Sequence, residues 1–307
     1  MIPVTVIGGY LGAGKTTLIN GLLRGTHGRR LAVLVNDFGA IDIDARLLAD
    51  HDGDTISLAN GCVCCTIADA LGDALNKVSA MRPAPDHIVI EASGVANPAK
   101  IAMYGQGWPG LRLDGIIVMA DAESVRARSE DKFVGGTVRQ QLTAADLLVL
   151  NKMDLLTRDQ CDLVRQWLET QAPDGRIATA CHGDLPASVL LGQIAAQDRR
   201  YQAQGDGMAR HDTYRAVPFR TARPLDRIRL GLQIASWPAG ILRAKGLVHI
   251  FDDPGYAYIL QLVGARYTLE KGPAWGKERP VTEIVVIAAA ADLNPGFLES
   301  SLLSACL

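Results

Sequence analysis

The stretch Gly9-Tyr10-Leu11-Gly12-Ala13-Gly14-Lys15-Thr16 decides the fold of this chain. It matches the pattern G-x-x-x-x-G-K-[ST], follows a short apolar run at residues 4–7 and precedes a segment with helical periodicity. Glycines let successive backbone amides approach a phosphate group, and the start of the helix adds a partial positive charge. The sequence therefore predicts a phosphate-binding loop between a strand and a helix.

Two side chains of this loop have distinct expected roles. Lys15 is expected to bridge the β- and γ-phosphates of a nucleotide, and the hydroxyl of Thr16 is expected to bind Mg²⁺. The predicted phosphate-binding residues are Gly9, Gly12, Ala13, Gly14, Lys15, Thr16 and Thr17.

Short apolar runs alternate with amphipathic stretches over the N-terminal part of the chain, as in a parallel sheet flanked by helices. The apolar runs are rich in Val, Ile and Leu without alternation, which is typical of strands buried on both faces. We predict an α/β fold with a doubly wound, mostly parallel sheet. Strands are expected at residues 4–7, 31–35, 87–90, 115–120, 147–150 and 176–180, and helices at 15–23, 67–78, 158–170 and 187–193.

The pattern changes after residue 197. Residues 198–211 are polar and contain glycine, so we predict a linker between a domain at 1–197 and a second domain at 212–307. The turn Asp252-Asp253-Pro254-Gly255 between two apolar runs indicates antiparallel strands, and hence a smaller α+β domain. Its strands are expected at residues 214–220, 247–251, 256–263 and 282–288, and its helices at 225–234 and 295–306.

The tetrad Asn151-Lys152-Met153-Asp154 ends a predicted strand and indicates which base is bound. In an open α/β sheet, ligands bind at the carboxyl ends of the strands. The carboxylate of Asp154 can accept hydrogen bonds from guanine N1 and N2 together, whereas adenine offers no such pair of donors. Lys152 would cover the base with its alkyl stem. The sequence therefore predicts GTP rather than ATP, with Asn151, Lys152 and Asp154 as nucleotide-binding residues.

Two further strand ends carry carboxylates. Glu91 ends a predicted strand and is followed by Ala92-Ser93-Gly94, so it could hold Mg²⁺ through water or orient the attacking water, with Gly94 near the nucleotide. An alternative is that Glu91 caps the helix that follows Pro98. Asp37, in the stretch 36–39, is expected in a loop that senses the γ-phosphate. Lys15, Glu91 and Asp37 are the predicted catalytic residues.

Three of the six cysteines fall within Cys62-Val63-Cys64-Cys65. In a reducing compartment these thiols favour a metal site over disulfides. Soft sulfur ligands favour Zn²⁺, with Co²⁺ or Ni²⁺ as alternatives and Cu⁺ as a competitor, and three protein ligands leave a fourth position open for exchange. A buried apolar turn or a redox thiol cluster would also fit the pattern. The three other cysteines, Cys161, Cys181 and Cys306, are expected to be small buried hydrophobic residues.

Taken in order along the chain, these motifs resemble those of the CobW family of metal-associated P-loop GTPases, relatives of HypB and UreG. The resemblance rests on residues 9–17, 36–39, 61–65, 91–98 and 151–154. In addition, residues 240–246 resemble the CobW C-terminal domain. The resemblance implies a GTPase metallochaperone. Many family members have a glutamate-rich loop and a histidine-rich linker. Here the loop reads Asn36-Asp37-Phe38-Gly39-Ala40 and the linker region offers only His211.

Net charge and the N-terminal sequence indicate which kinds of partner and which compartment to expect. The formal net charge of −2 gives no electrostatic reason to expect nucleic acid or a membrane surface as a partner. Residues 1–7 lack the basic and apolar pattern of a signal peptide, so a cytoplasmic location is expected. The expected partner is a client metalloprotein, and the chain could also form a homodimer. The alternative functions are a GTP-dependent regulator or assembly factor whose thiols sense metal or redox state, and, disfavoured by Asp154, an ATP-dependent kinase.

Overall fold

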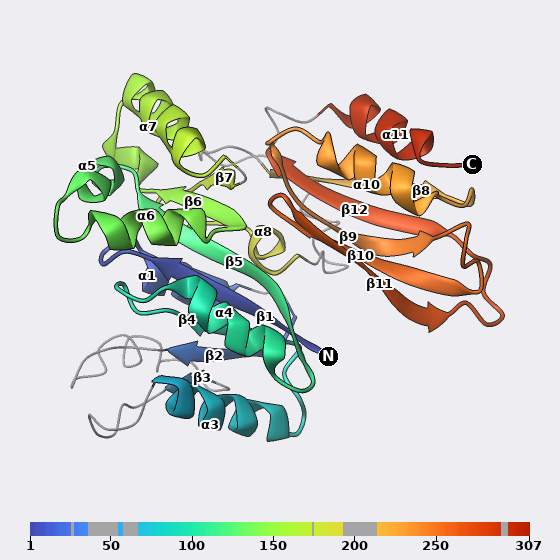
Figure 1. The fold of residues 1–307 in the computed structure, drawn as a ribbon, viewed down its shortest axis with the longest axis horizontal. Coiled ribbons are helices and arrows are strands. Elements are labelled where there is room, and N and C mark those ends of the chain that lie inside the picture. The colour runs from blue at the N-terminus through green and yellow to red at the C-terminus, as the bar shows by residue number, and fades with distance from the viewer. Residues whose placement is uncertain (26–27, 36–54, 58–66, 174, 193–213, 290–293) are drawn as a thin grey trace. The chain divides into compact units, whose positions relative to one another are not determined.

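The computed structural model describes residues 1–25, 28–35, 55–57, 67–173, 175–192, 214–289 and 294–307 (Figure 1). These residues form two compact units, each described by itself below. One unit comprises Met1–Gly175 with Thr179–Leu191, and the other comprises Arg176–Ala178 with Gly192–Leu307. The predicted domain boundaries near residues 197 and 211 lie outside the described residues.

A seven-stranded sheet with the order β3-β2-β4-β1-β5-β6-β7 forms the centre of the first unit. Its last strand, β7, contains the residues Arg176–Ala178 that the division above assigns to the second unit. β1 pairs in parallel with both β4 and β5, β2 with β3 and β4, and β5 with β6, which confirms the predicted parallel sheet. The strands are β1 (Ile2–Gly9), β2 (Leu31–Val35), β3 (Thr55–Ser57), β4 (His87–Glu91), β5 (Leu111–Asp121), β6 (Leu147–Asn151) and β7 (Arg176–Thr179).

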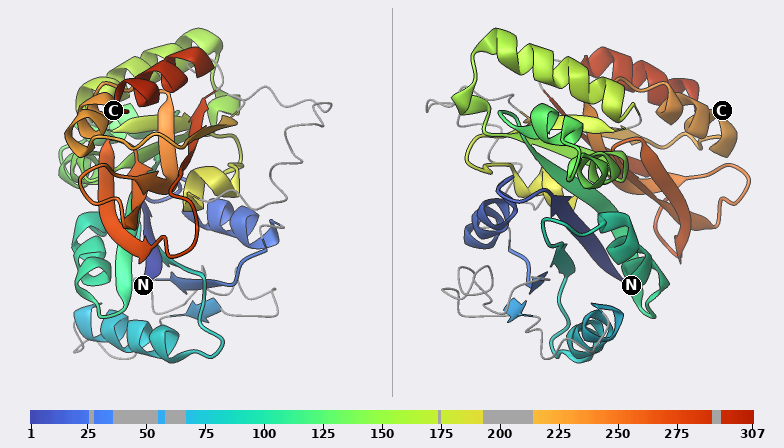
Figure 2. Two further views of the ribbon diagram at one scale, coloured as in Figure 1. Left: turned by 90° about the vertical axis from the view of Figure 1, so that its right-hand side faces the viewer. Right: turned by 60° about the vertical axis from the view of Figure 1, so that its left-hand side comes forward.

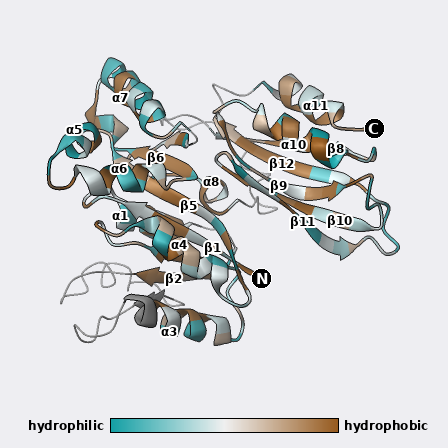
Figure 3. Cartoon of the chain, in the orientation of Figure 1, coloured by the Kyte–Doolittle hydropathy of each residue, from teal (hydrophilic) through white to brown (hydrophobic). Residues whose placement is uncertain are grey.

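Helices cover both faces of this sheet, with α1 and α4 on opposite sides in Figure 2. Much of β2, β5 and β6 is hydrophobic, as the brown parts of these strands in Figure 3 show, and apolar residues of all three strands are buried. The helices are α1 (Lys15–Arg24), α3 (Ile67–Ala80), α4 (Pro98–Gly107), α5 (Val125–Glu130), α6 (Gly135–Thr143), α7 (Arg158–Gln171) and α8 (Ala187–Leu191), with a 3-10 turn η1 (Met153–Leu155).

The helix expected after Pro98 is α4. Besides the 3-10 turn η1, three elements of this unit were not predicted from the sequence, namely β3, α5 and α6. Each has a weak local signal: β3 has three residues, α5 has six, and α6 begins with the glycine pair Gly135-Gly136. The helix expected at residues 187–193 ends at Leu191, because Gly192 follows with the left-handed φ of 64° that commonly ends a helix.

The second unit is an antiparallel five-stranded sheet with the order β11-β10-β9-β12-β8, which confirms the predicted α+β class. Side chains of its two helices, including Leu230 and Leu302, pack with those of the sheet in one apolar core. The elements are β8 (Tyr214–Thr221), α10 (Arg227–Ala235), β9 (Ile241–His249), β10 (Tyr256–Val263), β11 (Arg266–Ala274), β12 (Thr282–Ala289) and α11 (Pro295–Ser304).

Three predictions for this unit need correction. The strand expected at residues 247–251 begins already at Ile241, and β11 was missed because most of its side chains are exposed and many are polar. The helix expected from residue 225 begins at Arg227, because Asp226 accepts a hydrogen bond from the Arg229 amide as its N-cap. Among the residues that the structure describes, none of the helices has the length and apolar character needed to cross a bilayer.

Candidate nucleotide-binding site

The candidate site lies where β1 ends, between its neighbours β4 and β5. The chain runs from β1 to one side of the sheet through β2, β3 and β4, and then crosses to the other side through β5. Such a switch point is where open α/β sheets bind ligands at the carboxyl ends of their strands. The loop from Gly9 to Thr16 occupies this position, and α1 begins within it at Lys15.

Two glycines of the loop are required by close packing. Gly9 has φ 131°, and a Cβ there would lie 2.3 Å from the carbonyl oxygen of Met119 in β5. Gly14 has φ 103°, and a Cβ there would lie 2.4 Å from the side-chain nitrogen of Asn151. A side chain at either position would force the phosphate loop away from the sheet.

Five of the seven predicted phosphate-binding residues line one cleft with the Glu91 segment. Lys15 is 8% exposed, and its Nζ donates a hydrogen bond to the Gly9 carbonyl at 3.0 Å, which holds the ammonium group inside the loop. Gly9 and Ala13 do not line the cleft and lie behind it. The lining residues are Leu11, Gly12, Gly14, Lys15, Thr16, Thr17, Val35, Glu91, Ala92, Ser93 and Gly94.

Thr16 and Glu91 meet across this cleft. The hydroxyl of Thr16 donates to Glu91 Oε1 at 3.0 Å, although the two residues are 75 positions apart in sequence. Hydroxyl and carboxylate oxygens are hard ligands suited to Mg²⁺, so this pair fits the metal that accompanies a nucleoside triphosphate. The alternative role of Glu91 as a helix cap does not apply, because Asn97 caps α4 by accepting from the Ala99 amide at 2.9 Å.

Asn151 forms hydrogen bonds to two loops around the site. Its Nδ2 donates to the Ala13 carbonyl at 2.9 Å, and its Oδ1 accepts from the Gly183 amide at 2.9 Å. The side chain is buried and thus joins β6 to the phosphate loop and to the segment after β7. The sequence predicted a nucleotide contact for Asn151. In the structure, its described side-chain contacts position the loops that surround the nucleotide site.

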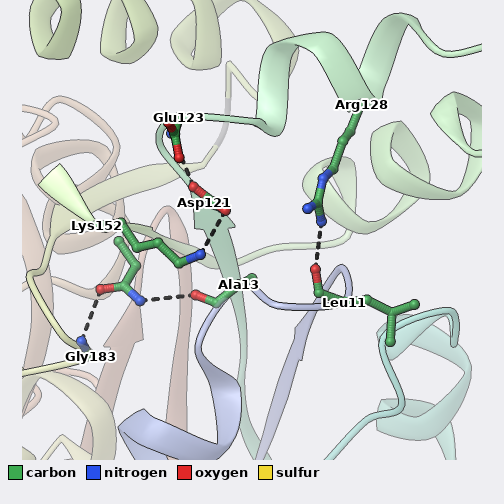
Figure 4. A network of polar contacts seen from close by, with 8 residues as sticks. Leu11, Ala13, Asp121, Glu123, Arg128, Lys152 and Gly183 are labelled. Atoms are coloured by element: carbon green, nitrogen blue, oxygen red, sulfur yellow. Dashed lines mark hydrogen bonds and ion pairs between the residues drawn. The ribbon is translucent and has the colours of Figure 1, made fainter. Parts of the chain in front are cut away.

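Lys152 is held by a residue that the sequence analysis did not single out. Its Nζ forms an ion pair with Asp121 Oδ2 at 2.9 Å (Figure 4). Burial acts to raise the pKa of Asp121, but hydrogen bonds from Lys152 and Ser124 outweigh it and keep that pKa below its usual value. The ionised Asp121 thereby fixes the extended side chain of Lys152. Its position directly after the strand predicted at residues 115–120 is the signal that could have identified it.

Asp154 lies beside two residues of the segment after β7. His182 Nε2 lies 3.6 Å from Asp154 Oδ2, and the side chain of Asp154 is 30% exposed and thus accessible to a ligand. Burial raises the pKa of the Cys181 thiol to about 11, and the nearby Asp154 carboxylate adds to this shift. Cys181 is therefore protonated at neutral pH. It is buried as predicted, as is Cys306, whereas Cys161 is half-buried.

The remaining predicted site residues lie outside the described part of the chain. They are Asp37 and the three candidate zinc ligands Cys62, Cys64 and Cys65. Within the ranges that the structure describes, no group of three or more His, Cys, Asp or Glu side chains is placed to hold a metal ion. The thiolate site and the Asp37 role stay predictions from the sequence.

Comparison with known proteins covers almost the whole chain. A family model described as the CobW/HypB/UreG nucleotide-binding domain matches residues 3–178, and a model of the cobalamin synthesis protein cobW C-terminal domain matches residues 214–307. The zinc chaperone CobW of Sinorhizobium sp is 33% identical, with 93% of this chain and 92% of that protein covered. The zinc chaperone CobW of Pseudomonas aeruginosa is 31% identical, with 95% and 88% covered. The crystal structure of the zinc-bound YjiA GTPase from E. coli aligns over 100% of this chain and 99% of its own, with a TM-score of 0.48 and 22% identity.

Proposed function

Since this chain belongs to the CobW/HypB/UreG family of nucleotide-binding proteins, we propose that it is a GTPase that delivers a divalent metal, foremost zinc, to a client metalloprotein. The observation that carries the proposal is the cleft in which Lys15, Thr16 and Glu91 converge, with Asn151 hydrogen-bonded to the phosphate loop. Two relatives that match over almost their full length are named zinc chaperones, which supports zinc as the cargo.

The roles within the nucleotide site follow from charge and position. The phosphate loop and Lys15 bind the phosphates, Thr16 and Glu91 hold Mg²⁺ or the attacking water, and Lys152 and Asp154 bind guanine. Mg²⁺ supplies positive charge where negative charge builds up on the phosphate oxygens. Asp121 and Asn151 contribute by holding Lys152 and the loops in place.

The metal-binding part of the proposal rests on the sequence. Cys62, Cys64 and Cys65 would supply three thiolates to zinc and leave one position for transfer, with Co²⁺ or Ni²⁺ as alternative cargo. These cysteines lie in sequence between the Asp37 segment and Glu91, so the state of the γ-phosphate can influence the metal site. The second unit would supply the surface for the client or for a second copy of the chain, and the protein would act in the cytoplasm.

Replacing Glu91 with glutamine is expected to slow GTP hydrolysis by about 10²-fold while changing GTP affinity much less. The amide keeps a hydrogen-bond acceptor for Thr16 but loses the charge that Mg²⁺ or the attacking water requires. Single-turnover hydrolysis and equilibrium nucleotide binding measure the two effects separately. Glu123→Gln, at an exposed position after β5, is the matched control. An unchanged hydrolysis rate in Glu91→Gln would leave Glu91 with a structural role.

Zinc affinity is expected to differ between the complexes with a GTP analogue and with GDP. Thermodynamic linkage then requires zinc to change the affinity ratio of the two nucleotides by the same factor, typically about 5–150-fold. Zinc titrations of both complexes, paired with nucleotide titrations with and without zinc, measure this coupling. Two superimposable zinc curves would remove nucleotide-gated transfer from the proposal and favour a GTPase that senses metal without delivering it.

The cysteine cluster is tested in the same titrations. Cys64→Ser is expected to lose most of the zinc affinity, because a serine hydroxyl is a harder ligand and does not ionise near neutral pH. Nucleotide binding should persist, since the phosphate loop uses none of these sulfurs. Cys306→Ser is the control, because it removes a buried thiol of the second unit that hydrogen-bonds to the Leu302 carbonyl. Equal zinc binding by Cys64→Ser would place the metal elsewhere.

A further inference from the structure

Leu11 and Gly94 both line the phosphate cleft and lie in close contact. A Cβ on Gly94 would lie 2.5 Å from Leu11 Cδ2 and 2.9 Å from the Leu11 amide nitrogen. The first residue belongs to the phosphate loop and the second to the segment after Glu91, and they line the cleft together with Lys15 and Thr16. In the proposed complex, the two residues flank the γ-phosphate and the attacking water. The separation of the two backbones is therefore critical for hydrolysis.

Gln141 of α6 holds the Gly94 side of this contact. Its Nε2 donates to the Gly94 carbonyl at 3.0 Å and to the Ala96 carbonyl at 2.8 Å. The Gln141 side chain is 2% exposed and thus shielded from water. Loss of its amide group would therefore leave the two carbonyl oxygens without this hydrogen-bond donor. Because both acceptors are carbonyl oxygens, the amide group is locked in one orientation.

Arg128 of α5 holds the Leu11 side. Its Nη1 donates to the Leu11 carbonyl at 2.5 Å, as Figure 4 shows, across 117 positions of sequence. The guanidinium carbon lies 5.2 Å from the centroid of the Tyr10 ring, which is within the range of a cation–π contact. Two neighbouring residues of the phosphate loop are thus tied to one arginine.

The two helices that carry these side chains are joined to each other. Arg139 of α6 donates a hydrogen bond to the Ser129 carbonyl of α5. The carboxylate of Asp131, between the helices, accepts from the Phe133 and Val134 amides at 2.8 and 3.0 Å, and its carbonyl accepts from the Gly135 amide at 2.9 Å. A displacement of one helix is therefore passed to the other. Arg128 and Gln141 also line the same small cavity beneath Tyr10 and Ala13.

We propose that Gln141 and Arg128 are positioning residues for GTP hydrolysis, which set the spacing between Gly94 and Leu11 at the γ-phosphate. The inference rests on the proposed GTPase function and adds two residues that are not among the lining residues of the phosphate cleft. In the proposed complex, Lys15 and Gly14 bind the phosphates that GDP shares with GTP and Asp154 binds the base, and only the γ-phosphate of GTP would lie between Gly94 and Leu11. Loss of the hydrogen bonds from Gln141 or from Arg128 should therefore slow hydrolysis and leave GDP affinity largely unchanged.

The test uses the full chain, two single variants each with a control on the same helix, one conservative variant and one double variant. Gln141→Leu removes both donors but preserves most of the side-chain volume, and Arg128→Ala removes the contact with Leu11. Each has a control on the same helix: Gln140→Leu on α6, and Arg126→Ala on α5, where an exposed ion pair with Glu130 at 3.6 Å is lost. Single-turnover GTP hydrolysis, the Kd for GDP and the melting temperature are measured for each.

We expect Gln141→Leu and Arg128→Ala each to lower the hydrolysis rate constant by about 10–100-fold, since misplacement of reacting groups by an ångström can cost about 10²-fold. The Kd for GDP should stay within about 2-fold of the unmodified chain, and both controls should match that chain. Arg128→Lys should recover part of the rate, because it restores a charged donor without the guanidinium fork. The double variant Gln141→Leu with Arg128→Ala should lose less than the product of the single losses, because both act on one spacing.

Two results would overturn the inference. One is hydrolysis at the unmodified rate in both Gln141→Leu and Arg128→Ala. The other is a fold-loss of GDP affinity as large as the fold-loss of the hydrolysis rate constant. This result would mean that Gln141 and Arg128 support the fold of the whole phosphate loop. A chain that in unmodified form neither binds nor hydrolyses GTP would instead refute the proposed function, and this outcome is separate from the other two.

Discussion

Lys15→Ala is expected to lower the rate of GTP hydrolysis by at least about 10²–10³-fold, the scale seen when one group that stabilises transition-state charge is removed. Lys15 is 8% exposed, and its ammonium group is held inside the loop by the Gly9 carbonyl. In such a shielded position its interaction with the β- and γ-phosphate oxygens is stronger than it would be in water. Alanine removes this charge where the negative charge of the reacting phosphates accumulates.

Multiple- and single-turnover hydrolysis assays measure this loss, and GDP binding should weaken as well, because the β-phosphate also loses a partner. Lys77→Ala, at an exposed position in the last turn of α3, should behave like the unmodified chain. Hydrolysis by Lys15→Ala at an unreduced rate would show that the measured activity does not come from this phosphate loop.

Asp154→Asn is expected to weaken GTP binding by about 10²-fold and to shift the preference towards xanthosine triphosphate. The carboxylate accepts from guanine N1 and N2, and each hydrogen bond to a charged group contributes about 1.5–3 kcal/mol. Asparagine presents an amide that can donate, which matches the carbonyl oxygen that xanthine carries in place of the guanine amino group. Competition between GTP, XTP and ATP for the two proteins measures the shift.

Asp159→Asn, in the first turn of α7, is the control, because it makes the same substitution at an exposed position nearby. The unmodified chain should prefer GTP to ATP clearly. Equal binding of ATP and GTP by the unmodified chain would contradict guanine recognition by Asp154 and reopen the kinase alternative.

Features built from consecutive residues could be read directly from the sequence. The phosphate loop brings its glycines, Lys15 and Thr16 together within eight consecutive residues, so its pattern is visible in the sequence without knowledge of the rest of the fold. The same holds for Lys152 and Asp154 after a strand, and for Cys62, Cys64 and Cys65 as a potential ligand set. Buried parallel strands were also predictable, because long apolar runs are required to fill both faces of the sheet.

Elements with weak local signals depended on their surroundings. α6 begins with two glycines, and α5 spans six residues, too few for a stable isolated helix. Their formation relies on packing against the sheet and on each other, for which a short window of sequence holds no information. The exposed strand β11 was missed for the same reason, since its pairing with β10 determines its structure.

The sequence by itself determined the doubly wound nucleotide fold, the family and the phosphate loop, and it predicts a preference for guanine. Tertiary structure decided which side chains hold that loop in place: Arg128 reaches Leu11 across 117 positions, Asn151 reaches Ala13 across 138, and Asp121 reaches Lys152 across 31. The physical reason is that a hydrogen bond requires its partners within about 3 Å and in alignment, a condition that strand order and helix packing create. Contacts between residues so far apart in the chain cannot be predicted from a local sequence pattern.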